Sequence, residues 1–197
     1  MRRLLAKNFL NRTMSESKFK WNSDKLLSLF AMGISFITLI IFIYQTNLMS
    51  RQNFISIMPY LDLSTTNDIA NNIFELNLKN HGVGPAIIES VELTYKGKRY
   101  ELADYDNHMF SLLKAIAPAL DSVNYVSFST LDKGMAIPAN TVYNIFHVEG
   151  SEEDYKLITD NLQRLREEGL DYEIIYKSIQ DERWRLHDNS EGPEKLD

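Results

Sequence analysis

The chain has no cysteine among its 197 residues. This absence excludes a disulfide framework, a zinc site built from thiolates, an iron–sulfur cluster and a cysteine nucleophile. It does not fix the compartment, because an oxidising space tolerates a chain with nothing to oxidise. The chain also lacks an excess of positive charge, because its 21 Lys and Arg are outnumbered by 27 Asp and Glu and the formal net charge is −6. A general nucleic-acid-binding surface needs an excess of Lys and Arg, so we expect no nucleic-acid partner.

Sequence patterns that carry catalysis are lacking as well. The sequence contains no Walker motif, no Gly-x-Ser-x-Gly elbow and no HExxH pair. The segment Gly82–Pro85 lacks the third glycine and the following helix of a dinucleotide-binding loop. The histidines show no metal-ligand spacing; they are His81, His108, His147 and His187. We therefore predict a protein that is not an enzyme, with no catalytic residue, no metal and no cofactor.

The charge that is present is unevenly distributed. Residues 1–25 carry a net charge of +5, and residues 26–197 carry −11. Between them, Leu26–Tyr44 forms 19 consecutive residues without a charge. A bilayer core requires about 20 helical residues, so this stretch is long enough to span it. We predict a basic tail over 1–23, which is either disordered or bound to anionic lipid, then a transmembrane helix over 24–46 and a linker over 47–52.

The apolar stretch predicts an uncleaved signal anchor. A cleaved signal peptide has an apolar region of about 7–15 residues and a small-x-small cleavage site, and this sequence has neither. The basic flank precedes the span, so the positive-inside rule predicts a cytoplasmic N-terminus and a C-terminal domain in the periplasm or outside the cell. We expect a single-pass protein of a bacterial inner membrane. Either Met1 or Met14 could be the start, because the flank after Met14 is still basic.

Small side chains recur along the predicted span with a 3-4-3 spacing, at Ser28, Ala31, Ser35 and Thr38. Such a stripe permits the close approach of two membrane helices, so it is a candidate contact for a homo-oligomer. The alternative is that small residues are simply common in membrane helices.

The sequence after residue 52 alternates in the manner of β-strands. In Asn72–Lys79, for example, apolar and polar side chains alternate along the chain. Pro59 predicts that the first strand is an edge strand or carries a bulge. Ile88 is out of phase with its strand and predicts a bulge at Glu89-Ser90. The expected strands are Phe54–Leu63, Asn72–Lys79, Ala86–Tyr95, Arg99–Leu102, Tyr125–Ser129, Thr141–Val148 and the two arms of a final hairpin around 172–186.

Two segments predict helices. Residues 152–168 have an apolar face, Ser151 as N-cap and Gly169 as terminator. A shorter helix is expected over 106–116, with Asp106 as its cap. We predict a mainly β protein: one N-terminal transmembrane α-helix, then an immunoglobulin-like antiparallel β-sandwich over 53–188 with an inserted α-helix, and a flexible tail over 189–197.

A resemblance supports this fold. The segments PYLDL, FELNLKNHGVGPAIIESVEL, Ile137-Pro138 and EIIYKSIQDERWRL resemble uncharacterised bacterial single-pass membrane proteins with an Ig-like or CARDB-like β-sandwich domain. The likeness covers residues 58–186 discontinuously and implies a fold, but it offers no catalytic residue to transfer.

The final hairpin holds three aromatic residues that could form an interaction face: Tyr172, Tyr176 and Trp184. The alternative, which we favour, is that they pair across the strands in the core. We expect a membrane-anchored protein-binding or scaffold domain facing the periplasm, with the lipid bilayer and another membrane or periplasmic protein as partners. The alternative is an oligomeric membrane effector or sensor whose β domain binds a ligand in the cytoplasm.

Overall fold

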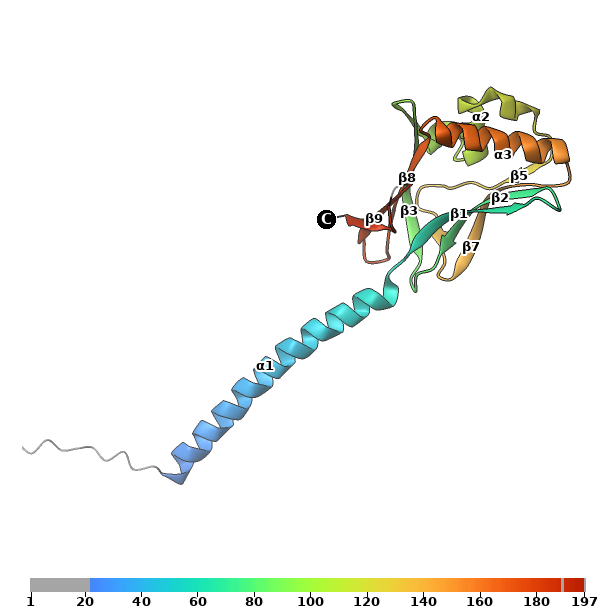
Figure 1. Cartoon of the computed structure of the whole chain (residues 1–197). Helices are drawn as coiled ribbons and strands as arrows, with labels where there is room; N and C mark the ends of the chain where they lie inside the picture. Colours follow the sequence, from blue (N-terminus) through green and yellow to red (C-terminus); the bar gives the residue numbers. More distant parts are fainter. Residues whose placement is uncertain (1–21, 189, 197) are drawn as a thin grey trace, which may run out of the picture. The chain divides into compact units, whose positions relative to one another are not determined.

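The structure, a computed structural model, describes residues 22–188 and 190–196 (Figure 1). The chain divides into two compact units, Met1–Met49 and Ser50–Asp197. Most of the predicted basic tail therefore lies outside the described residues.

The first element is a single long helix, α1 (Ser23–Ile57, 35 residues). Its segment Ser23–Asn53 is long and apolar enough to cross a membrane. The helix also covers residues 47–52, the predicted linker, and the boundary between the two compact units falls within this stretch. No glycine or proline occurs between Gly33 and Pro59 to stop the helix. The helix ends just before Pro59, because a proline disfavours the helical conformation of the residue that precedes it.

The first strand, β1, runs over Leu61–Asp68. The expected strand Phe54–Leu63 is therefore wrong in its first part: only residues 61–63 belong to β1, because the first residues belong to α1 and Pro59 lies between the two elements. The backbone around Pro59 packs closely against the turn after β2. An added Cβ at Gly84 would lie 1.9 Å from the Ile57 carbonyl oxygen, so this contact requires glycine.

Asn80 holds this turn against the start of β1. Its side-chain amide is buried and makes four hydrogen bonds. Asn80 Oδ1 accepts from the backbone N–H groups of Tyr60 at 3.1 Å and Gly82 at 2.9 Å. Asn80 Nδ2 donates to the carbonyls of Gly84 at 2.9 Å and Ile137 at 3.0 Å. The turn glycines thus have a structural role.

The strands form two antiparallel sheets. The four-stranded sheet has the order β1-β2-β7-β5, and the six-stranded sheet has the order β10-β9-β8-β3-β4, with β6 paired to β3. This arrangement confirms a mainly β fold with antiparallel pairing. The remaining strands are β2 (Ile73–Asn80), β3 (Ala86–Tyr95), β4 (Lys98–Glu101), β5 (Val126–Phe128), β6 (Ala136–Ile137), β7 (Thr141–Val148), β8 (Asp171–Lys177), β9 (Arg183–His187) and β10 (Glu194–Leu196).

The pairing register confirms the predicted bulge in β3, since it shifts between Ile88 and Ser90 against β8. At the other end of the domain, the predicted flexible tail is wrong for Glu194–Leu196. These residues pair with β9, and Arg185 Nη2 donates to Glu194 Oε2 at 2.6 Å. Asn189 and Asp197, also part of that prediction, lie outside the described residues.

Two helices complete the domain, α2 (Met109–Ile116) and α3 (Glu152–Glu167), together with the 3-10 turns Leu102–Tyr105 and Pro118–Ser122. The predicted cap of α3 is confirmed, because Ser151 Oγ accepts from the Asp154 N–H at 3.2 Å. Asp106 is not the cap of α2. It has a φ of +53°, and the helix starts after His108. α3 packs on β2 and β7, with Tyr155, Ile158 and Leu165 in the core.

Candidate functional site

A pocket of about 760 Å³ opens between the two sheets of the domain. Its walls come from β1, from α3 and from the strands β8 and β9 with the segment that follows β9. We call it the β1 pocket, because six of the eight β1 residues line it: Leu61, Asp62, Leu63, Ser64, Thr65 and Asn67. Its size lies within the range of about 300–1,000 Å³ that is typical of ligand sites.

The floor of the β1 pocket is apolar and belongs to the hydrophobic core. Phe74 of β2, Leu93 of β3, Leu113 of α2 and Leu186 of β9 are all buried there. Phe74 stacks on Phe146, with ring centroids 5.9 Å apart. The floor is therefore fixed by core packing and can accept apolar side chains from a partner.

The rim of the β1 pocket is mostly acidic. Its carboxylates are Asp62, Asp171, Asp188 and Glu191, and its basic groups are Arg166 and His187. Arg166 Nη2 lies 3.6 Å from Asp188 Oδ1, so one acid is already paired. Asp62 Oδ2 lies 3.8 Å from His81 Nε2 on the exposed surface.

Tyr172 stands at this rim with its ring half-buried. Burial, together with the nearby carboxylates of Asp188 and Asp62, raises the pKa of its hydroxyl to about 12. The hydroxyl is therefore neutral at physiological pH and can donate a hydrogen bond to a ligand.

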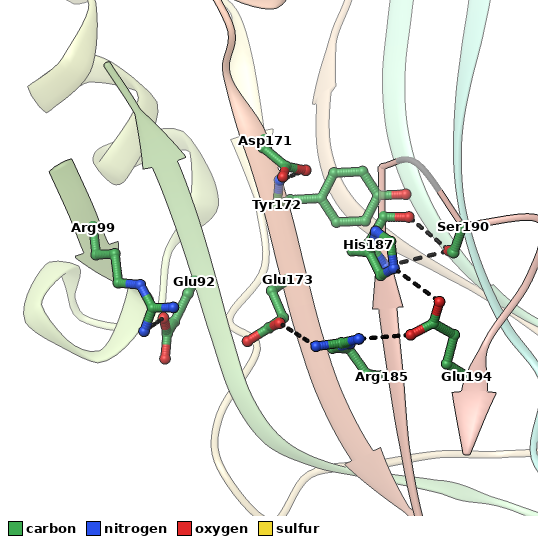
Figure 2. Close-up of polar contacts among 9 residues, drawn as sticks. All are labelled: Glu92, Arg99, Asp171, Tyr172, Glu173, Arg185, His187, Ser190 and Glu194. Carbon is green, nitrogen blue, oxygen red and sulfur yellow. Dashed lines mark hydrogen bonds and ion pairs between the residues drawn. The ribbon is translucent and has the colours of Figure 1, made fainter. Parts of the chain in front are cut away.

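Polar contacts connect β10 to the pocket wall at the end of β9 (Figure 2). The Ser190 hydroxyl donates to the His187 carbonyl at 2.7 Å, and His187 Nε2 lies 3.3 Å from Glu194 Oε1. Arg185 lies between two carboxylates. Its Nη1 is 3.7 Å from Glu173 Oε2, and its Nη2 is 2.6 Å from Glu194 Oε2. These contacts tie β10 to β8 and β9, beside the pocket-lining residues His187 and Ser190.

The structure separates the three aromatic residues of the predicted interaction face. Tyr176 and Trp184 are buried in the core and stack with centroids 5.9 Å apart. They cannot form an exposed face, and their cross-strand pairing agrees with the core alternative. Tyr172 alone of the three lines the β1 pocket.

The small-residue stripe lies on α1 with all four side chains exposed. Ser28, Ser35 and Thr38 each donate to the carbonyl four residues earlier, at 2.7–2.9 Å. Their hydroxyls are thus satisfied within the helix. A helix–helix contact through this stripe stays a prediction.

The four histidines lie apart in the fold. His147 lies between two carboxylates, with Nδ1 3.0 Å from Glu75 Oε1 and Nε2 3.0 Å from Glu149 Oε2. His108 precedes α2 and packs edge-on against Phe128. Within the described part of the chain, no group of three or more His, Asp or Glu side chains is placed to hold a metal ion.

The sequence did not reveal the β1 pocket, because its walls combine residues more than one hundred positions apart. The one local signal was the charge of the segments 61–68 and 188–191, which hold acids and no lysine or arginine.

Comparison with known proteins gives no relative from which a function could be transferred. No known protein family matches the sequence, and no curated protein is significantly similar to it.

Proposed function

We propose that this protein is a membrane-anchored, non-enzymatic binding domain, and that the β1 pocket is where it binds another protein. The observation that carries the proposal is the pocket itself. It has an apolar floor fixed by core residues and a charged rim, which is the combination that protein partners use for affinity and orientation.

The anchor in this proposal is α1, acting as an uncleaved signal anchor in a bacterial inner membrane. The net charge of +5 in residues 1–25 supports a cytoplasmic N-terminus and a periplasmic or extracellular domain. The two antiparallel sheets support an immunoglobulin-like or CARDB-like sandwich as the domain class. Domains of this architecture serve many functions, so the binding role depends on the pocket and not on the fold.

Site-specific photo-crosslinking in the native membrane tests the proposal. A photoreactive residue replaces Gln163, which is exposed on α3 and lines the pocket, or Asp160, which is exposed on α3 and is not among the residues that line it. We expect a discrete protein adduct from position 163 and none from position 160. Equal labelling at both positions, or none at either, would refute the binding role.

A second pair of variants ties the adduct to the pocket. Thr159→Trp places a large ring over the pocket, and Asp160→Trp places the same ring on the exposed side of α3. The adduct should fall sharply in the first variant and persist in the second.

A further inference from the structure

β1 is an outer strand with few of the features that keep strand edges from pairing. Among the outer strands that the described residues form, β1 is the longest: it has eight residues, whereas β4, β5, β6 and β10 have two to four. Its register with β2 is unbroken from Leu61 to Asp68. It contains no bulge, proline or lysine, which proteins commonly place on exposed edges.

Two hydrogen bonds show which way the backbone groups of β1 point. The Tyr60 carbonyl accepts from the His81 N–H at 2.8 Å, so the backbone groups of Tyr60 point toward β2. The Leu61 N–H donates to the Tyr176 hydroxyl at 3.3 Å, so the backbone groups of Leu61 point away from β2. Successive residues alternate in an antiparallel pair. The N–H and C=O groups of Leu63, Thr65 and Asn67 therefore point to the open edge.

This open edge faces the β1 pocket. Residues 61 to 65 of β1 all line the pocket, although neighbouring side chains point to opposite faces of the sheet. The strand therefore presents its edge to the pocket, and not one face of the sheet. Within the described residues, the Ser64 hydroxyl is buried without a hydrogen-bond partner.

The charge around the edge favours a basic occupant. Within the described part of the chain, Asp62, Asp171 and Glu191 have no lysine or arginine at ion-pair distance. A second copy of β1 would bring its own Asp62 and Asp68 to this rim, and like charges repel. An extended segment with lysine or arginine would meet opposite charges instead.

We propose that β1 receives an extended, basic segment of the partner protein as an added strand. The inference rests on the proposed function and specifies how that partner binds. The main chain of the segment pairs with Leu63, Thr65 and Asn67, its apolar side chains enter the pocket, and its bases meet the acidic rim.

Synthetic peptides test the role of the main chain. The full-length protein in nanodiscs of zwitterionic lipid is titrated with an eight-residue peptide that alternates valine and lysine. We expect binding that weakens at high salt, and at least tenfold weaker binding of the valine–glutamate counterpart. Two further peptides are N-methylated at either the valines or the lysines. Because alternate residues face the partner strand, one of these two should lose at least tenfold in affinity and the other should bind like the parent.

A matched pair of proline variants tests the role of β1. Thr65→Pro removes an N–H that points to the open edge, so it leaves the pairing with β2 intact. Thr66→Pro removes an N–H that bonds to β2, so it should lower the melting temperature. We expect Thr65→Pro to melt near the wild-type temperature and to bind the lysine peptide at least tenfold more weakly. Hydrogen exchange of wild-type Leu63 and Thr65 should slow when the peptide is added, which is a readout that needs no variant.

The outcomes separate the two proposals. Unchanged peptide binding to Thr65→Pro, equal binding of both methylated peptides or unchanged exchange would overturn strand addition. A dimer of the wild type that Thr65→Pro abolishes would assign the edge to a second copy and overturn it too. If the adduct from position 163 persists in Thr65→Pro, the binding domain stands and strand addition falls. If the wild type gives no adduct, both fall.

Discussion

At the scale of single residues, Asn80 shows how a buried polar side chain can hold a turn against the start of a strand. It lies just before the turn that holds Gly82 and Gly84, and its amide joins that turn to the start of β1 and to β6. A buried amide with four hydrogen bonds is costly to remove, because each abandoned backbone group stays buried. Local sequence could not show this role, since the Ile137 carbonyl is 57 residues away.

Asn80→Ala should therefore destabilise the domain strongly. Leaving several buried backbone groups unpaired is expected to lower the free energy of unfolding by about 3 kcal/mol or more. The measurement is denaturant unfolding of a fragment covering Ser50–Asp197, which is one compact unit. Asn71→Ala, on the exposed turn before β2, is the control and should change stability by about 0.5 kcal/mol or less. Similar effects of both changes would contradict the role of Asn80.

His147 makes the stability of the four-stranded sheet depend on pH. Burial alone would lower the pKa of His147, but the carboxylates of Glu149 and Glu75 together raise it above its usual value of 6.5. A hydrogen bond from Asn77, with His147 as a smaller cause, lowers the pKa of Glu75 below 4.5. A raised histidine pKa contributes stability at low pH that is lost as pH rises through it, and a lowered carboxyl pKa contributes stability that is lost as pH falls through it.

The contribution of this pair should therefore be largest between about pH 4.5 and 6.5 and should decline above that range. Unfolding free energies of the wild type and His147→Gln, measured from pH 4 to 9, test the expectation. The difference between them should shrink as pH rises past the histidine pKa. A difference that is constant with pH would mean that His147 is not protonated beside Glu75 and Glu149.

At the scale of elements, the local sequence pattern predicts the bounds of those strands and helices whose ends depend on their own residues and not on contacts with distant segments. The bounds of β3 and β7 were predicted from alternation, and the start and cap of α3 from Ser151 and its acidic first turn. β1 and β10 were predicted wrongly. The residues before Pro59 continue α1, and β10 is only three residues long, so its pairing depends on β9. The pocket was missed for the same reason, since it depends on contacts between elements distant in sequence.

The β8–β9 hairpin offers the clearest test of an element's packing. Trp184 is 1% exposed and stacks on Tyr176 across the hairpin. Trp184→Ala should lower the free energy of unfolding by about 3–5 kcal/mol, because it removes a large buried ring. In the fragment Ser50–Asp197, Trp184 is the one tryptophan, so its fluorescence should be blue-shifted in the folded state. Emission near that of free tryptophan, with unchanged stability of the variant, would place this ring on the surface.

At the scale of the whole molecule, the expectation is an anchored domain. Ile37 and Ile40 lie near the middle of the apolar part of α1. Replacing both with arginine should cost about 2.5–3.5 kcal/mol per residue at a membrane centre and should prevent insertion. The wild-type protein should stay with membranes after carbonate extraction, and the double variant should not. Complete release of the wild type by carbonate would contradict the anchor.

The most direct test of the central claim uses the absence of cysteine, since a single introduced cysteine is then unique. Thr65→Cys places an exposed thiol on β1 in the wall of the pocket, and Lys133→Cys places it on an exposed turn away from the pocket. A membrane-impermeant maleimide is applied to intact cells and to the purified protein. For a binding domain outside the cytoplasm with an occupied pocket, position 133 should label in both samples, and position 65 should label more slowly in cells than after purification. Failure of both positions to label in intact cells, or equal rates for position 65 in the two samples, would contradict the claim.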